Sequence, residues 1–173
     1  MNPSPDAIAQ NDASIQFEEK QQRYILTQVE QFTFVLPLTL VAEIPIVERS
    51  QILVMPFYSP VVMGVLHHAG HVTPLVSLRQ LLGIAKGFAT ERLTVVQLSA
   101  AAAEQAGLGL VVDRTLGMRS HSQLPPDLFD AVQSNIEPNM RLFKPEILAD
   151  SLWQPLRWRS TRSREQLSVI SDQ

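Results

Sequence analysis

The chain has 173 residues, of which 45% are hydrophobic and 18% are charged, and its formal net charge is −3. This composition is typical of a globular domain with a substantial core, and it excludes a largely disordered chain. The slight acidity gives no support to a nucleic-acid-binding or membrane-surface protein. The absence of cysteine excludes disulfides and thiolate metal sites, and it fits the reducing cytoplasm in which we expect the protein to act.

The N-terminal 21 residues are predicted to form a flexible tail. They are polar and acidic, and they lack the apolar segment of a signal peptide. The most apolar run, residues 32–47, contains two prolines and Glu43 and is shorter than the roughly 20 residues of a membrane-spanning helix. We therefore expect no direct membrane insertion.

The first half of the domain reads as short strands. Residues 24–29 and 32–36 have hairpin spacing, but Glu30-Gln31 is an unfavourable two-residue turn, so a short bulge is the alternative. Pro37 is expected to end the second strand. Residues 38–43 form a connector of ambiguous type, and short strands are expected within 44–48 and 51–55 because the surrounding prolines oppose helices.

The central hairpin is the clearest local pattern. Residues 63–68 and 71–77 are predicted strands around an Ala69-Gly70 turn, where Gly70 can adopt a positive φ without strain. Residues 78–82 have the apolar spacing of one helical turn, which Gly83 is expected to end.

A second group of strands is predicted at 93–98, 107–113, 115–118 and 140–143. Residues 99–106 are alanine-rich but too few for an isolated helix, so we expect a hairpin loop. Pro125-Pro126 predicts a loop over 121–130. Pro145 and Glu146 suit the first turn of a helix over 145–152.

These patterns predict an all-β fold with minor α structure. The domain is expected to span residues 22–153, with two β-barrel sub-domains at about 22–83 and 92–145. Residues 154–173 form a basic tail, because four of the eleven arginines lie within 157–164. That tail is either a solvated terminus or a contact for an acidic partner. Trp153 and Trp158 are expected to pack it onto the barrel.

Three histidines flank the central turn. His67 and His71 lie on opposite arms of the hairpin and are close enough in principle to share a metal. A site would require a third ligand, and the nearest carboxylate along the chain is Glu48. A small-molecule- or metal-binding barrel using His67, His68 and His71 is therefore the alternative hypothesis. The other interpretation is a set of polar side chains around an exposed turn.

The sequence predicts no enzyme and no cofactor. It contains neither a P-loop nor a nucleophile elbow, and Gly107-Leu108-Gly109 is not a dinucleotide fingerprint. No pair of carboxylates is favoured for acid–base chemistry. We therefore expect neither catalytic residues nor a metal site.

Glu43 lies between Val41-Ala42 and Ile44-Pro45, an apolar neighbourhood. A carboxylate there is either exposed on a strand edge or paired with another group. Both an outward-facing residue and a polar contact at a protein interface are compatible with the pattern.

Residues 64–79 read G-V-L-H-H-A-G-H-V-T-P-L-V-S-L-R. This resembles the G-[VI]-x-N-L-R-G-x-[VI]-x-P-[VI]-x-D-L-R pattern of the CheW-like domain of bacterial chemotaxis coupling proteins. Residues 34–38 and 41–44 resemble the family's upstream segments, and Gly109 to Asp113 resembles its G-[ILV]-[ILV]-V-D strand. Together with the closing segment 140–148, the resemblance covers roughly residues 22–152.

The resemblance implies two five-stranded barrels of the SH3 type around a shared apolar core. It implies an adaptor that catalyses nothing and couples the cytoplasmic tip of a methyl-accepting chemoreceptor to the regulatory domain of a CheA-like histidine kinase. The residues expected to carry these contacts are Val41, Glu43, Gly64, His67, His68, Ala69, Gly70, Pro74 and Arg79.

Two departures from the family pattern predict divergent partners. His67-His68-Ala69 replaces Asn-Leu-Arg, and Ser77 replaces an aspartate. Glu43 matches the family's acid, but the cation expected at position 69 is absent, and losing one member of an interface charge pair can cost a few kcal/mol. Arrays that control type IV pilus motility or phototaxis are candidate settings.

Overall fold

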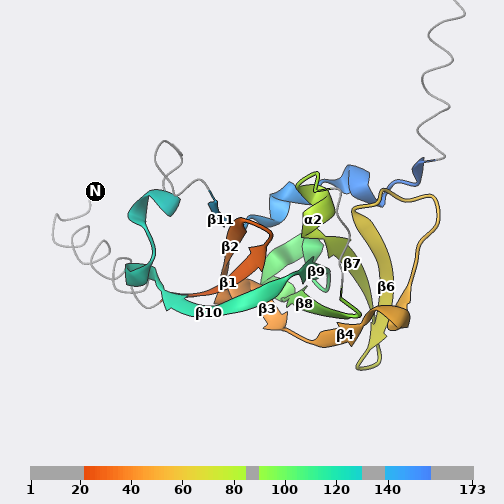
Figure 1. Cartoon of the computed structure of the whole chain (residues 1–173), viewed down its shortest axis with the longest axis horizontal. Helices are drawn as coiled ribbons and strands as arrows, with labels where there is room; N and C mark the ends of the chain where they lie inside the picture. Colours follow the sequence, from red (N-terminus) through yellow and green to blue (C-terminus); the bar gives the residue numbers. More distant parts are fainter. Residues whose placement is uncertain (1–21, 85–89, 130–138, 157–173) are drawn as a thin grey trace, which may run out of the picture.

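The computed structural model describes residues 22–84, 90–129 and 139–156. These residues fold into short strands joined by tight turns and single helical turns (Figure 1). The strands are β1 (Arg23–Val29), β2 (Phe32–Pro37), β3 (Val41–Glu43), β4 (Ile46–Glu48), β5 (Ile52–Leu53), β6 (Val62–His68), β7 (His71–Ser77), β8 (Arg92–Leu98), β9 (Gly109–Val112), β10 (Arg114–Ser120) and β11 (Met140–Leu142). The predicted class, mostly β with little helix, is confirmed.

The described helical structure consists of one α-helix and several 3-10 turns. The α-helix is α2 (Leu78–Leu81). The 3-10 turns are η1 (Leu38–Leu40), η2 (Arg49–Gln51), η3 (Ala100–Gln105), η4 (His121–Gln123), η5 (Pro126–Leu128), η6 (Pro145–Ile147) and η7 (Asp150–Trp153). Within the described ranges, no helix is long and apolar enough to cross a bilayer.

The strands pair into two sheets. One has four strands in the order β10-β1-β2-β11, and the other has seven, in the order β3-β8-β9-β7-β6-β5 with β4 also paired to β8. Each sheet combines strands from both halves of the chain, because β1 pairs with β10 and β7 pairs in parallel with β9. The sheets therefore do not follow the division expected at 22–83 and 92–145. Clusters of strands along a chain indicate where turns fall, but not which distant edge a hairpin meets.

The seven-stranded sheet curls strongly. Glu43 on β3 and His68 on β6 approach to 3.5 Å, although three strands separate them in the sheet order. Four strand spacings in a flat sheet would place them about 19 Å apart. Curling of the sheet therefore brings β3 beside the tip of the β6–β7 hairpin. Five strands in each of two closed barrels remain a prediction.

Three apolar clusters fill the fold. The largest lies between the two sheets and includes Phe34, Leu36, Val96 and Leu110. A second lies within the curled sheet, and a third lies between β1–β2 and the η4–η5 segment. Neighbouring residues of one strand enter different clusters, as Val95 and Val96 do, so the strand is buried on both faces. This explains why the central strands read as continuous apolar runs.

The predicted turns are largely confirmed. Ala69 and Gly70 both have positive φ, 50° and 81°, as a two-residue hairpin of the primed type requires. Glu30-Gln31 also forms a two-residue turn without a bulge, because Val29 pairs with Phe32. α2 begins after Ser77, whose hydroxyl accepts a hydrogen bond from the Gln80 amide, and Gly83 follows it at φ 72°.

The helix predicted over 145–152 is instead two 3-10 turns, η6 and η7. Leu148 leaves the helical region at φ −87°, ψ 77° and is 1% exposed. Burying this side chain in the core between the sheets breaks the helix. Trp153, at the end of η7, packs against the same core as expected, whereas Trp158 lies outside the described residues.

The loop predicted over 99–106 contains η3, whose two halves are separated at Ala103 (φ 51°, ψ −115°). The loop predicted over 121–130 contains η4 and η5, and its last residue, Asp130, is outside the described residues. The expected tails, 1–21 and most of 154–173, are likewise outside them, so the domain boundaries remain predictions.

Candidate protein-interaction surface

The tip of the β6–β7 hairpin and the neighbouring strand β3 form one surface. The His68 Nε2 atom lies 3.5 Å from the Glu43 Oε1 atom, and the two side chains are 38% and 48% exposed. Glu43 is therefore both exposed on a strand edge and paired with another side chain, the two arrangements that the sequence allowed. His68 supplies the cationic partner when protonated, one position before the missing arginine of the family pattern.

The hairpin register separates the histidines. His68 lies opposite His71, while His67 lies opposite Val72, and successive side chains of a strand point to opposite faces. His67 and His71 therefore do not face each other, contrary to the arrangement that the metal hypothesis needed. Among the described residues, no group of three or more histidines and carboxylates is placed to hold a metal ion.

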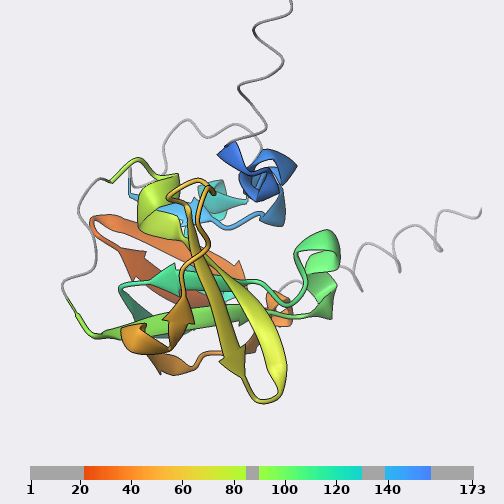
Figure 2. The same cartoon turned by 90° about the vertical axis from the view of Figure 1, so that its right-hand side faces the viewer.

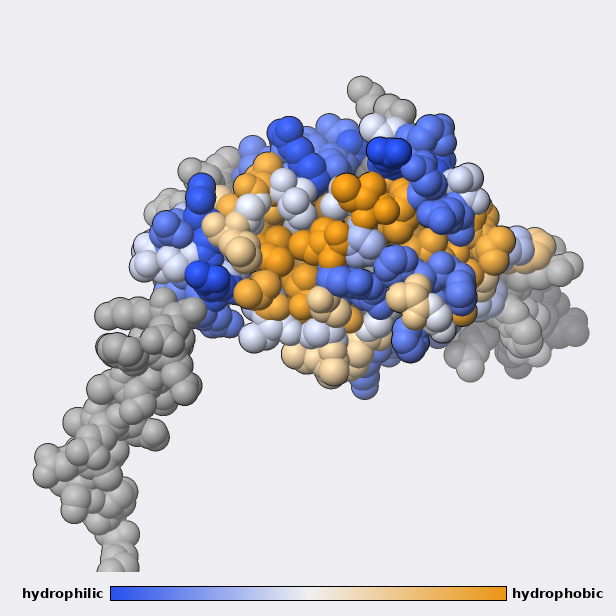
Figure 3. Space-filling view, turned by 90° about the horizontal axis from the view of Figure 1, so that it is seen from below, coloured by the Kyte–Doolittle hydropathy of each residue, from blue (hydrophilic) through white to orange (hydrophobic). Residues whose placement is uncertain are grey.

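Apolar side chains are exposed on β7 and on β4. Val72 on β7 is 66% exposed, and Ile46 on β4 is 71% exposed. Ala69 and Gly70 at the tip are also exposed. Figure 3, which views the molecule from below, shows apolar and charged patches side by side over this end. Exposed apolar groups near polar ones are a usual composition for a protein-binding surface.

Gly64 lies away from this tip and is buried. A Cβ atom built on it would come within 2.2 Å of the Leu53 carbonyl oxygen, and its φ is 145°. The register of β6 against β7 shifts between Val62 and Gly64. The glycine is therefore required for the close approach of β5 and β6, and a direct contact with a partner remains a prediction.

Two further predicted residues are half-buried. Val41 on β3 packs against the core between the sheets. Pro74 lies opposite Val65 on β6, just outside the β7–β9 pairing that begins at Leu75. A proline at this position leaves no ladder bond unmade. Both side chains support the strands that carry the surface.

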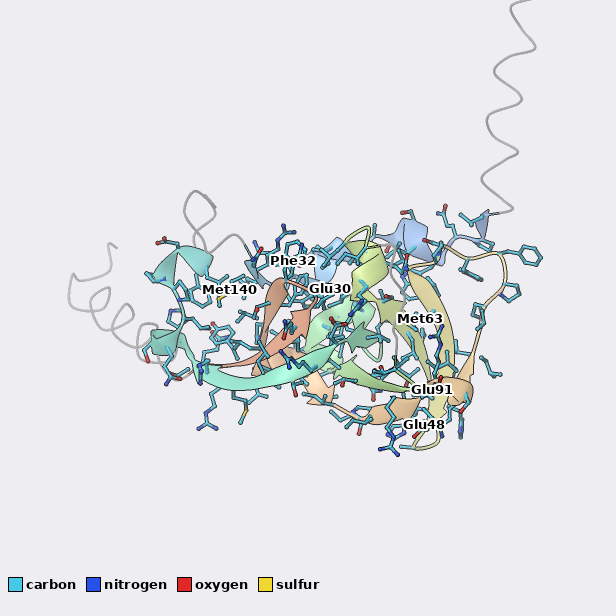
Figure 4. All side chains as sticks on the ribbon, viewed as in Figure 1. Glu30, Phe32, Glu48, Met63, Glu91 and Met140 are labelled. Carbon is cyan, nitrogen blue, oxygen red and sulfur yellow. The ribbon has the colours of Figure 1, made fainter. Side chains whose placement is uncertain are left out.

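Arg79 lies on α2, at the opposite end of the molecule from the hairpin tip (Figures 1 and 2). Its Nε atom donates to Asp113 Oδ1 at 2.6 Å, and one terminal nitrogen donates to Asp113 Oδ2 at 2.8 Å. Its other terminal nitrogen donates to Glu30 Oε1. The Glu30 side chain, labelled in Figure 4, lies beneath α2. We call these three residues the latch, because they join the β1–β2 turn to α2 and the end of β9.

The latch is largely enclosed. The side chains of Arg79 and Asp113 are 15% and 19% exposed, and the Glu30 amide donates to Asp113 Oδ2 at 2.7 Å. Hydrogen bonding to Asp113 raises the pKa of the Arg79 guanidinium above its usual value, with smaller contributions from the charges of Asp113 and Glu30 and against an opposing effect of burial. The guanidinium therefore stays charged at every physiological pH.

The sequence did not reveal this pairing. Arg79 and Asp113 lie in separate segments of the family pattern, 34 residues apart. Each follows a buried strand, β7 and β9, and these strands lie side by side in the same direction. A charged residue after each of these two strands is the sequence feature that could have indicated the Arg79–Asp113 pair.

Strand β10 is a second exposed feature that the sequence did not indicate. It is the edge of the four-stranded sheet, and nearly all its residues are exposed. Leu116 and Met118 are 47% and 54% exposed, with Arg114 and Arg119 on the same strand. An edge strand of this composition can take part in protein contacts.

A family model describing the CheW-like domain matches residues 23–141. The chain belongs to the CheW-like domain family. No curated protein matches it. Among solved structures it is similar to the crystal structure of scaffolding protein TtCheW from Thermoanaerobacter tengcongensis, at 18% identity and a TM-score of 0.48. That match covers 58% of this chain and 65% of the other, just under two thirds of its length.

Membership in this family of non-enzymatic scaffolds supports a scaffold or adaptor role in chemotaxis signal transduction. The match covers both sheets through β11, and therefore includes the hairpin tip, β3 and the latch.

Proposed function

We propose that this protein is a cytoplasmic chemosensory adaptor that couples the tip of a methyl-accepting receptor to the regulatory domain of a CheA-like histidine kinase. The match of a CheW-like model to residues 23–141 is the observation that carries the proposal. The setting is an array controlling type IV pilus motility or phototaxis. The divergent His67-His68-Ala69 sequence supports a partner set that differs from the usual one.

The proposed contact surface comprises Val41, Glu43, His67, His68, Ala69 and Gly70, with Gly64 and Pro74 shaping the hairpin behind it. Partial exposure of the Glu43–His68 pair supports this assignment, because the pair is accessible without being fully solvated. Arg79 acts on the surface indirectly, since its enclosed contacts fix the position of one sheet on the other. Such an adaptor transmits signals as coupling free energy between the receptor and kinase sites.

Reconstitution tests the proposal. Receptor-bearing vesicles, the kinase and the full chain are mixed, and the kinase that sediments with the vesicles is measured. We expect recruitment that depends on the chain and that falls with the His68→Glu variant, which places a carboxylate beside Glu43. The matched control is Arg92→Met, which removes an exposed ion pair with Glu48 on β4. Failure of a folded chain to recruit any cognate kinase would contradict the proposal.

A further inference from the structure

An apolar patch lies on β5 and the loop after it, away from the latch. Leu53, Val54 and Phe57 are 69%, 76% and 61% exposed. Val54 also lines a hollow of about 350 Å³, together with Met55, Tyr58 and Met63. Figure 4 shows Met63 on β6, beside this edge of the sheet. A contiguous exposed apolar patch beside a hollow is typical of a binding surface, whereas single exposed apolar residues are common on any protein.

Phe57 has a backbone conformation that a bulky residue rarely adopts. Its φ is 69°, in the left-handed region that favours glycine. An aromatic residue there costs conformational energy, which the surrounding structure must offset. The ring is nevertheless largely exposed.

The C-terminal end of the described chain reaches this patch. The Leu156 amide donates a hydrogen bond of 2.6 Å to the Phe57 carbonyl oxygen. Leu156 itself is 45% exposed. In Figure 1 the last described residues lie beside the loop that follows β5. The segment that continues from Leu156 therefore starts at the edge of the patch.

We propose that this chain's own segment 157–173 covers the patch, with the Trp158 indole seated in the hollow against Val54 and Met55. Trp158 follows Leu156 by two residues, and two extended residues span at most about 7 Å. Tryptophan has a large apolar surface to bury and a polar N–H that can remain near water. Leu167, Val169 and Ile170 give the same segment further apolar side chains.

The proposed contact between this segment and the patch is independent of the adaptor proposal, because it concerns the isolated chain and needs no receptor or kinase. A second copy or a partner protein on the same patch is the competing occupant, and either would leave the patch uncovered in dilute isolated protein.

Fluorescence tests the proposal directly, because Trp153 and Trp158 are the chain's two tryptophans. In a full-length Trp153→Phe variant, Trp158 is the sole indole reporter. We expect its emission in the folded protein to be blue-shifted from that of the denatured protein, and acrylamide quenching to be several-fold weaker. Val54→Asp, at a position 76% exposed, should remove both effects without unfolding the domain.

Leu116→Asp on β10 is the matched control and should leave the emission unchanged. A native emission equal to that of the denatured chain and unmoved by Val54→Asp would overturn the proposal. A blue shift that disappears on dilution would also overturn it, because the occupant would then be a second copy.

Discussion

Two charge pairs lie at opposite ends of this molecule, and they differ in hydrogen-bond geometry and in side-chain exposure. The latch binds Arg79 to Asp113 through two parallel hydrogen bonds, with both side chains less than 20% exposed. The pair at the hairpin tip is one 3.5 Å approach between Glu43 and His68, with both side chains more than a third exposed. An enclosed bidentate pair holds elements together, whereas an exposed single contact contributes little to stability and stays accessible to a partner.

The comparison teaches that a charged residue within a family motif does not by itself mark an interface. Arg79 is expected from the family pattern at the interaction surface, but it forms ion pairs with Asp113 and Glu30 of the same chain. The family pattern predicts that Glu43 lacks its cationic partner, yet the His68 Nε2 atom lies 3.5 Å from the Glu43 carboxylate. Exposure and hydrogen-bond geometry separate the two roles.

The largest expected effect comes from breaking the latch. Arg79→Met should lower the free energy of unfolding by about 3 kcal/mol, because it leaves the Asp113 carboxylate largely enclosed and without its bidentate partner. Urea unfolding measures this. The control Arg92→Met removes an ion pair whose arginine is 76% exposed and should cost less than about 1 kcal/mol. Equal losses for the two variants would contradict the distinction.

The contribution of the latch to the free energy of unfolding should also persist at alkaline pH. Because the folded state raises the pKa of Arg79, its contribution to stability is fully present below the unfolded-state pKa and is lost only as the pH rises through the raised value. The stability difference between wild type and Arg79→Met should therefore stay constant from pH 7 to about pH 10. A decline within that interval, measured by urea unfolding, would show that another group controls the latch.

Gly64 and Gly70 differ in how much space surrounds the position of an added side chain. Gly64→Ala should cost about 3 kcal/mol or more, because the new methyl group would meet the Leu53 carbonyl in addition to the strain of a positive φ. Gly70→Ala at the tip should cost only about 1 kcal/mol, because nothing lies within 4 Å of the added atom. Thermal unfolding of both variants measures the difference, and a reversed order would contradict the assigned packing.

The smallest expected effect belongs to the tip pair. A double-mutant cycle with Glu43→Gln and His68→Ala should give a coupling energy below about 1 kcal/mol, falling further in high salt. Urea unfolding of the four proteins measures it. A coupling of several kcal/mol would mean that the pair is a second latch.

Much of the fold could be predicted because the signals are local. Continuous apolar runs indicated the strands. Gly70 indicated the hairpin turn, and Gly83 indicated the end of α2. Intrinsic propensity alone makes Glu30 an unfavourable turn residue. Its place in the turn is explained by the bond from Arg79, 49 residues away, which outweighs that preference.

The pairing of the sheets could not be predicted in the same way. Whether β1 meets β10, or β3 meets the hairpin tip, depends on how the sheets curl and pack after the strands have formed. The helix expected over 145–152 failed for a related reason, because burial of Leu148 outweighs local helix preference. The candidate site was recognised as a stretch of sequence, but its division into latch and tip required three-dimensional contacts.

Calorimetric titration of the kinase regulatory domain with the full chain tests the central claim most directly, with wild type compared to His68→Glu. The account predicts saturable binding by the wild type and about tenfold weaker binding by the variant, with the free energy of unfolding changed by less than about 1 kcal/mol. Equal binding by both proteins, or none by a folded wild type, would contradict the assignment of the hairpin tip as the contact surface.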